Sequence, residues 1–158
     1  MIDYKGMFDA IFIKSVECVE SAVTAILSVH TQHAESGIEL VERLVNRENV
    51  VINLGFCNDS WQGILTCGGS YEDLQAIVHE TEMTIVIDAL GEVLNTTAGL
   101  IAAMPETMEA FGELNQTTPV TMEGGTFYPK ATGVQIDLLI ASSRLRFGFA
   151  IRKVGVFQ

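Results

Sequence analysis

Hydrophobic positions follow a helical period in two long segments of the chain. The first runs from about Tyr4 to Ser28, where large apolar residues recur at three- and four-residue spacing: Phe8, Phe12, Val16, Val19, Val23 and Ile26. The second runs from Thr84 to Met104, and its apolar side chains fall on one face: Val86, Leu90, Val93, Leu100 and Met104. The sequence therefore predicts two long helices, each with one buried face.

Strand-like segments follow each of these helices. Residues 50–57 and 61–67 flank the turn cluster Asn58-Asp59-Ser60, which predicts a β-hairpin. Near the end of the chain, residues 134–140 and 145–151 alternate between apolar and other positions around the short turn 142–143, as in half-buried antiparallel strands. The segment from Ile38 to Val45 fits a strand through Leu40 and Leu44, or a helix through Val41 and Val45, and both remain open.

Two shorter helices are predicted from their end signals. Ser70 stands three residues before Asp73, a capping-box spacing, and opens a helix that ends at about His79. Pro105 should end the second long helix and restart it as an extra turn from Pro105 to Phe111, closed by Gly112. The polar stretch from Thr31 to Gly37 closes the first long helix.

The order of elements predicts the fold class. A long helix and strands are followed by a short helix, a second long helix and further strands, so the chain has two similar halves, each a helix followed by a meander. This order predicts an α+β fold in which two long helices cover one face of an antiparallel β-sheet. No linker divides the sequence, and residues 1–158 are expected to form a single domain.

One polar stripe crosses the second long helix. At about 100° per residue, Asp88, Glu92 and Asn95 fall on one narrow face, opposite the apolar one. The residues beside the stripe are small: Gly91, Ala98, Gly99 and Ala102. A solvated helix face is the ordinary explanation of such a stripe. The glycines favour another one, a flat track that a partner protein can approach closely.

The stripe resembles the signature of a known family. Asp88, then Glu92-x-x-Asn95 on a helix, then Gly99 and a distant Pro119, is similar to the pattern of the CheC/CheX/FliY group of chemotaxis phosphatases, with Pro119 one residue later than in that pattern. The first long helix carries Glu17 and Glu20 without an Asn three residues later, so the chain resembles CheX, with one stripe, more than CheC, with two. The resemblance implies a CheC-like fold.

The resemblance also implies an activity, the dephosphorylation of a phosphorylated, CheY-like receiver domain of a response regulator. Asn95 would orient the hydrolytic water, and Glu92 would engage the receiver's active-site lysine. Asp88, Gly91 and Gly99 would contact the partner. Because the receiver carries its own Mg²⁺, this chain would need no metal or cofactor. Homodimerisation through the sheets is implied too, with the C-terminal strand as the candidate contact.

Two other functions compete with this one. A non-catalytic module of the same fold could bind a receiver or another protein in a two-component or chemotaxis pathway and hydrolyse nothing. A cysteine-dependent phosphatase is disfavoured, because none of Cys18, Cys57 and Cys67 is followed by arginine six residues later. Which receiver is the substrate, and whether the pathway is chemotaxis, does not follow from these residues.

Composition and charge narrow the partners. Hydrophobic residues make up 48% of the chain and charged residues 18%, as in a globular protein. The formal net charge of −11 argues against nucleic acid and anionic membranes as partners. No uninterrupted apolar run approaches the ~18 residues of a membrane span, and the first residues do not resemble a signal peptide. We therefore expect a cytoplasmic protein.

Basic residues, cysteines and histidines offer weaker signals. Four of the nine basic residues lie near the end, Arg144, Arg146, Arg152 and Lys153, as on a solvated strand edge or, alternatively, a docking surface. Three cysteines without a Cys-x-x-Cys pair predict buried free thiols and no disulfide framework. His30 and His33 lack a third converging ligand, so a surface turn is expected there and no metal site.

Overall fold

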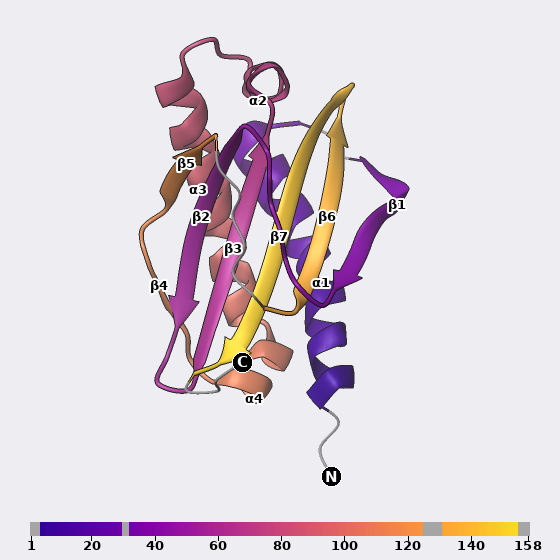
Figure 1. Cartoon of the computed structure of the whole chain (residues 1–158), viewed down its shortest axis with the longest axis vertical. Helices are drawn as coiled ribbons and strands as arrows, with labels where there is room; N and C mark the ends of the chain where they lie inside the picture. Colours follow the sequence, from indigo (N-terminus) through magenta and orange to yellow (C-terminus); the bar gives the residue numbers. More distant parts are fainter. Residues whose placement is uncertain (1–3, 30–31, 125–130, 155–158) are drawn as a thin grey trace.

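The structure, a computed structural model, describes residues 4–29, 32–124 and 131–154. Its elements follow one another along the chain as α1 (Tyr4–Leu27), β1 (Gln32–Val41), β2 (Val50–Cys57), β3 (Trp61–Gly69), α2 (Tyr71–Val78), α3 (Met83–Ala103), α4 (Pro105–Phe111), β4 (Asn115–Gln116), β5 (Val120–Glu123), β6 (Gly133–Ile140) and β7 (Ser143–Lys153). In these ranges the strands form one antiparallel sheet, and α1 and α3 pack against each other on one of its faces (Figure 1). The predicted fold class is confirmed.

Local signals at three element ends work as the sequence predicts. The carboxamide oxygen of Asn58 accepts hydrogen bonds from the amides of Ser60 and Trp61 at 2.9 Å each, which closes the β2–β3 hairpin. The hydroxyl of Ser70 accepts from the amide of Asp73 at 3.1 Å and caps α2. Pro105 separates α3 from α4, where it occupies the first turn and needs no amide hydrogen.

The two halves exchange their first strands, which differs from the predicted pair of meanders. The strand order is β1-β6-β7-β3-β2-β4, with β5 also paired to β2. Strand β1 of the first half therefore pairs with β6 of the second half, and β5 of the second half pairs with β2 of the first. The hairpins β2–β3 and β6–β7 stay local and meet where β3 pairs with β7.

The C-terminal strand β7 is central, so the prediction of a dimer contact along its edge is wrong, and the prediction of solvated basic residues holds only at its end. It pairs with β6 on one side and with β3 on the other, and it offers no edge to a second copy of the chain. Arg152 and Lys153 at its end are exposed, as predicted, whereas the other two basic residues form ion pairs. Arg146 bonds Asp137 of β6 through Nε at 2.8 Å and Nη2 at 3.0 Å, and Arg144 donates to Glu48 at 2.6 Å.

The polar stretch after α1 is a strand and not a turn. From Gln32 onward it belongs to β1, where His33 pairs with Leu138 of β6. Backbone pairing with β6 supplies the hydrogen bonds of this strand whatever its side chains are. The structure also settles the ambiguous segment as a strand from Ile38 to Val41. His30 and Thr31 lie outside the described residues.

The core lies between the helices and the inner face of the sheet. Alternate strand residues such as Leu54, Leu65 and Phe149 are buried there against the apolar sides of α1 and α3. The predicted core face of α3 holds at Val86, Leu90 and Val93, but Leu100 is 40% exposed. Around the helix axis, the Leu100 side chain points about 80° away from the centre of the buried face. That face is completed by Leu94, Thr97, Ala98 and Ile101.

The outer face of the sheet is partly covered by the segment between β1 and β2. Leu44 of this segment is 1% exposed and lies against Gly148 of β7, where a Cβ atom would come within 2.6 Å of Leu44 Cδ1. The amide of Leu44 donates to the carbonyl of Ala131 at 3.0 Å. Glycine at position 148 thus makes room for a second, smaller apolar cluster of Leu44, Ala131 and Ala150.

Helix α3 is as long and as apolar as a membrane span. Its 21 residues, Met83–Ala103, pass that test by length and composition, with a mean hydropathy of 1.4. The core explains this composition, because one side of the helix is packed against the sheet and α1. The opposite side carries Asp88 and Glu92, both exposed.

Candidate functional site

The polar stripe of α3 forms one wall of a groove. The groove has a volume of about 290 Å³, and its other wall is the extended segment 118–121 at the start of β5. Asp88, Gly91, Glu92 and Asn95 line it from the helix, and Thr118, Pro119 and Thr121 line it from the strand side. Ile52 of β2 and Ile87 contribute apolar surface. The structure therefore brings four of the five predicted site residues together.

The three polar side chains of the stripe are accessible. Asp88 and Glu92 are exposed, and Asn95 is half-buried. Within the described part of the chain, none of the three has a hydrogen-bond or ion-pair partner for its side chain. These three remain available to a group that enters the groove.

Glycines bring the two walls close together. A Cβ atom on Gly91 would lie 3.8 Å from Cβ and Cγ of Pro119, so the helix and the proline are in contact at this point. Pro119 therefore faces the stripe, although it stands one residue late in the sequence pattern. Gly99, the fifth predicted residue, does not line the groove; it lies beyond its end, where a Cβ atom would be 3.6 Å from Nε2 of Gln116.

The groove has a distinct electrostatic character. Two carboxylates, Asp88 and Glu92, stand about 6 Å apart along the helix, one turn from each other. Asn95 is neutral and follows Glu92 after a further 4.5 Å or so. No lysine or arginine is among the described residues that line the groove. The Asp88 end is thus suited to a cationic group of a partner, and the Asn95 end tolerates an anionic one.

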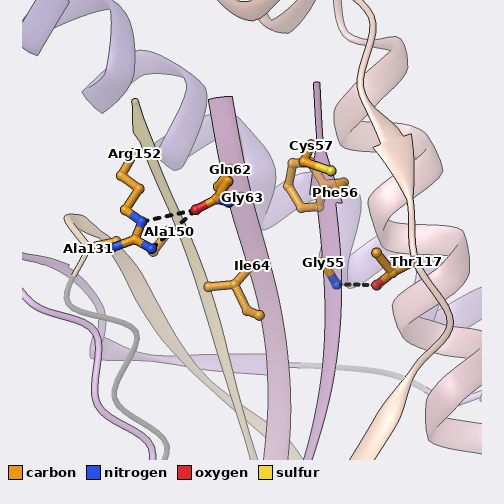
Figure 2. A pocket seen from close by; sticks show the side chains of 10 residues that line it. All are labelled: Gly55, Phe56, Cys57, Gln62, Gly63, Ile64, Thr117, Ala131, Ala150 and Arg152. Carbon is orange, nitrogen blue, oxygen red and sulfur yellow. Dashed lines mark hydrogen bonds between the residues drawn. The ribbon is translucent and has the colours of Figure 1, made fainter. Parts of the chain in front are cut away.

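A second hollow lies on the opposite face of the sheet (Figure 2). It has a volume of about 320 Å³, and its centre is formed by Gly55, Ile64 and Ala150, which lie side by side on β2, β3 and β7. At its rim Nη2 of Arg152 donates to Oε1 of Gln62 at 3.1 Å. No carboxylate or imidazole is among its described lining residues. Although this hollow is larger than the groove, its described residues lack the carboxyl and imidazole groups that acid–base catalysis commonly uses.

The cysteines and histidines do not form a site in the described residues. Cys67 is fully buried, and burial raises the pKa of its thiol. Cys18 and Cys57 are half-buried, and burial, followed by the charge of Glu17, raises the pKa of the Cys18 thiol. All three are free, as predicted, but only one is fully buried. In the described ranges no cluster of three or more His, Cys, Asp or Glu side chains could hold a metal ion.

Sequence reasoning missed the strand wall apart from Pro119. Thr118 and Thr121 carry no motif of their own, and their place in the groove follows from the pairing of β5 with β2. The one local signal was their position beside Pro119. Ile52 and Ile87 fit ordinary core patterns and gave no signal at all.

Comparison with known proteins identifies the fold. No protein-family model matches the sequence, and no curated protein matches it. Among solved structures, a CheC-like superfamily protein from Shewanella sp. PV-4 superposes with a TM-score of 0.69 at 12% identity, over 90% of this chain and 97% of that one. A chain of the CheX–CheY–BeF₃–Mg²⁺ complex from Borrelia burgdorferi gives 0.63 at 16% identity, over 89% and 97%. The FliM middle domain from H. pylori gives 0.64 at 12% identity, over 94% and 92%.

The chain therefore has the fold of the CheC-like superfamily, which CheX-type chemotaxis proteins share. The match extends over nearly the whole chain in each case. The superpositions establish the fold, but identities of 12–16% do not carry over an activity. Any activity must be argued from the residues of the groove.

Proposed function

We propose that the protein is a phosphatase that removes the phosphoryl group from the aspartyl phosphate of a CheY-like receiver domain. The observation that carries the proposal is the groove, where Asp88, Glu92 and Asn95 stand accessible opposite Pro119. The shared fold with CheX in a CheX–CheY complex supports a receiver as the partner.

Hydrolysis of an acyl phosphate needs an in-line water and compensation of the charge on the leaving carboxylate. The oxygen of the water attacks phosphorus, the bond between phosphorus and the carboxylate oxygen breaks, and the aspartate leaves with the electron pair. One water proton stays on the oxygen that has bonded to phosphorus, and the other ends on a second phosphate oxygen or is released to solvent, so the products are the free aspartate and inorganic phosphate. Asn95 suits the water-orienting role, because its neutral amide both donates and accepts hydrogen bonds and does not repel the phosphoryl group.

Glu92 has a different task in this proposal. It stands one turn before Asn95 on the same helix face and would pair with the receiver's active-site lysine, which fixes the helix in register. Asp88 extends the acidic end, Gly91 lets Pro119 pack close beside the stripe, and Gly99 leaves the helix face low for the approach of a partner. The receiver supplies the Mg²⁺ that compensates charge at the reacting centre, so the phosphatase adds position and hydrogen bonds and no metal or cofactor of its own.

The test is the decay of a phosphorylated receiver from the same organism, with the wild-type protein and with Asn95→Ala and Glu92→Ala. We expect the wild type to accelerate decay and Asn95→Ala to lose about 100-fold of that acceleration, because a misplaced nucleophile costs about that much. Glu109→Ala on α4 is the matched control, since Glu109 is exposed and lies outside the groove. Equal decay with wild type and no protein, for every cognate receiver, would refute the proposal.

A non-catalytic binding module of the same fold is the second candidate. The observation in its favour is the shared fold with FliM, which also matches in a FliG–FliM complex at a TM-score of 0.58. Binding measurements separate the two candidates. A phosphatase loses turnover with Asn95→Ala while its affinity for the receiver changes little, whereas a binding module has affinity without turnover.

We further propose that the protein acts in the cytoplasm and as a homodimer. The first follows from the proposed partner, because receiver domains are cytoplasmic. For the second, β1 is the sheet edge to consider in place of β7, since it has β6 on one side and no other described strand on the other. Light scattering of the purified protein tests the dimer, and a monomeric mass would refute it.

A further inference from the structure

The segment before β5 runs along the stripe of α3 in the opposite direction, and two contacts fix its register. Pro119 meets the helix at Gly91, and Gln116 meets it at Gly99. These helix positions are about 12 Å apart at 1.5 Å per residue. The three residue steps from Gln116 to Pro119 cover about 10 Å in an extended chain. This length is close to the distance of about 12 Å along the helix, so the segment and the helix run side by side between the two contacts. Asn95 stands midway between the glycines, and positions 117 and 118 stand opposite it.

The two threonines at these positions point to different neighbours. The hydroxyl of Thr117 accepts from the amide of Gly55 at 2.8 Å, and its own amide donates to the Gly55 carbonyl at 2.8 Å, so Thr117 is fixed to the edge of β2. Thr118 lines the groove together with Asn95. Within the described residues its side chain has no hydrogen-bond partner.

Pro119 limits the freedom of Thr118. A residue before proline is held in the extended region, because the proline ring clashes with the helical alternative. Pro119 is itself packed beside Gly91. Thr118 is therefore held on both sides, by the bonds of Thr117 and by the ring of Pro119. A β-branched side chain on such a backbone also has few rotamers, so the Thr118 hydroxyl has few positions open to it in the groove that Asn95 also lines.

We propose that Thr118 is a second water-binding residue of this site, and that its hydroxyl and the amide of Asn95 hold the hydrolytic water between the two walls. This inference rests on the proposed phosphatase function. A water held by one amide can still turn about that hydrogen bond. A second bond from the opposite wall fixes the direction of its attacking lone pair, which is the orientation that in-line displacement of the aspartyl carboxylate requires.

The experiment compares Thr118→Val, Thr118→Ser and Thr24→Val. The first removes the hydroxyl at nearly constant shape, the second keeps the hydroxyl, and the third makes the same change at an exposed position of α1 outside the groove. We measure kcat at saturating phosphorylated receiver and Kd for the receiver with BeF₃⁻. We expect Thr118→Val to lower kcat about tenfold with Kd unchanged, as for one lost hydrogen bond. Thr118→Ser should lose less, because it keeps the hydroxyl but not the methyl that limits its rotamers, and Thr24→Val should stay near wild type.

Two results would overturn the inference. One is an unchanged kcat for Thr118→Val. The other is a Kd that rises as much as kcat falls, which would make Thr118 a docking residue. High-resolution crystal structures of wild type and Thr118→Val separate this failure from a failure of the proposed function. With no turnover in the wild type, a water between Asn95 and Thr118 that the variant lacks would still support the water site, and its absence from the wild type would refute it.

Discussion

Replacement of Gly91 by alanine should stabilise the protein, although the residue is buried. Gly91 lies in the middle of α3, where glycine is less favourable than alanine by about 0.5–1 kcal/mol. The added methyl would lie 3.8 Å from Cβ and Cγ of Pro119, an ordinary van der Waals distance, so the contact itself adds no strain. For a chain of 158 residues this gain corresponds to a rise in Tm of about 1–4 °C.

Thermal unfolding followed by circular dichroism measures this effect, and Gly133→Ala supplies the opposite control. A Cβ atom at position 133 would lie 1.9 Å from the carbonyl oxygen of Phe149. The backbone must move to accept it, and we expect a loss of about 3 kcal/mol or more. A fall in Tm for Gly91→Ala would refute the reasoning, because it would mean that α3 and Pro119 approach more closely than the structure describes.

Three further outcomes follow from contacts away from the groove. Leu44→Ala should lower the free energy of unfolding in urea by about 2–5 kcal/mol, because the Leu44 side chain is buried under its own segment against the outer face of the sheet. A decrease of less than about 1 kcal/mol would contradict that packing. Lys14 lowers the pKa of Glu106 from its usual 4.5, so this exposed pair stabilises above that value and loses its effect as the pH falls through the lower folded-state pKa; Glu106→Gln should have a slightly lower Tm than wild type at neutral pH and the same Tm in acid. Iodoacetamide should label half-buried Cys57 in the native protein and spare Cys67, which is buried and has a raised pKa. Mass spectrometry of the digested protein measures the labelling, and faster labelling of Cys67 than of Cys57 would contradict this prediction.

The sequence predicts best where the signal is local. The turn at Asn58, the cap at Ser70 and the restart at Pro105 each depend on a side chain and a backbone group only a few residues apart. The stripe belongs to the same class, because helical geometry alone places Asp88 beside Glu92. All four features were therefore predictable from one chain without knowledge of the tertiary structure.

The remaining features depend on residues far apart in the sequence. Strand β1 is polar at its start and gains its hydrogen bonds from β6, about a hundred residues later, so the composition of its first residues did not predict a strand. The exposure of Leu100 depends on which side of α3 faces the sheet and α1, and the burial of Leu44 depends on the space left by Gly148. Thr118 became part of the site through the contact between Pro119 and Gly91.

The exchange of first strands also bears on how the chain reaches its native state. Gln32 of β1 pairs with Leu139 of β6, so the outer strand of the first half has no partner until β6 has been synthesised and has left the ribosome. Contacts of such sequence separation slow folding, because the loop between the strands must close before the pairing gives any stability. During synthesis β1 would stay unpaired and the apolar side of α1 would stay uncovered until then, a state in which a nascent chain is prone to aggregate.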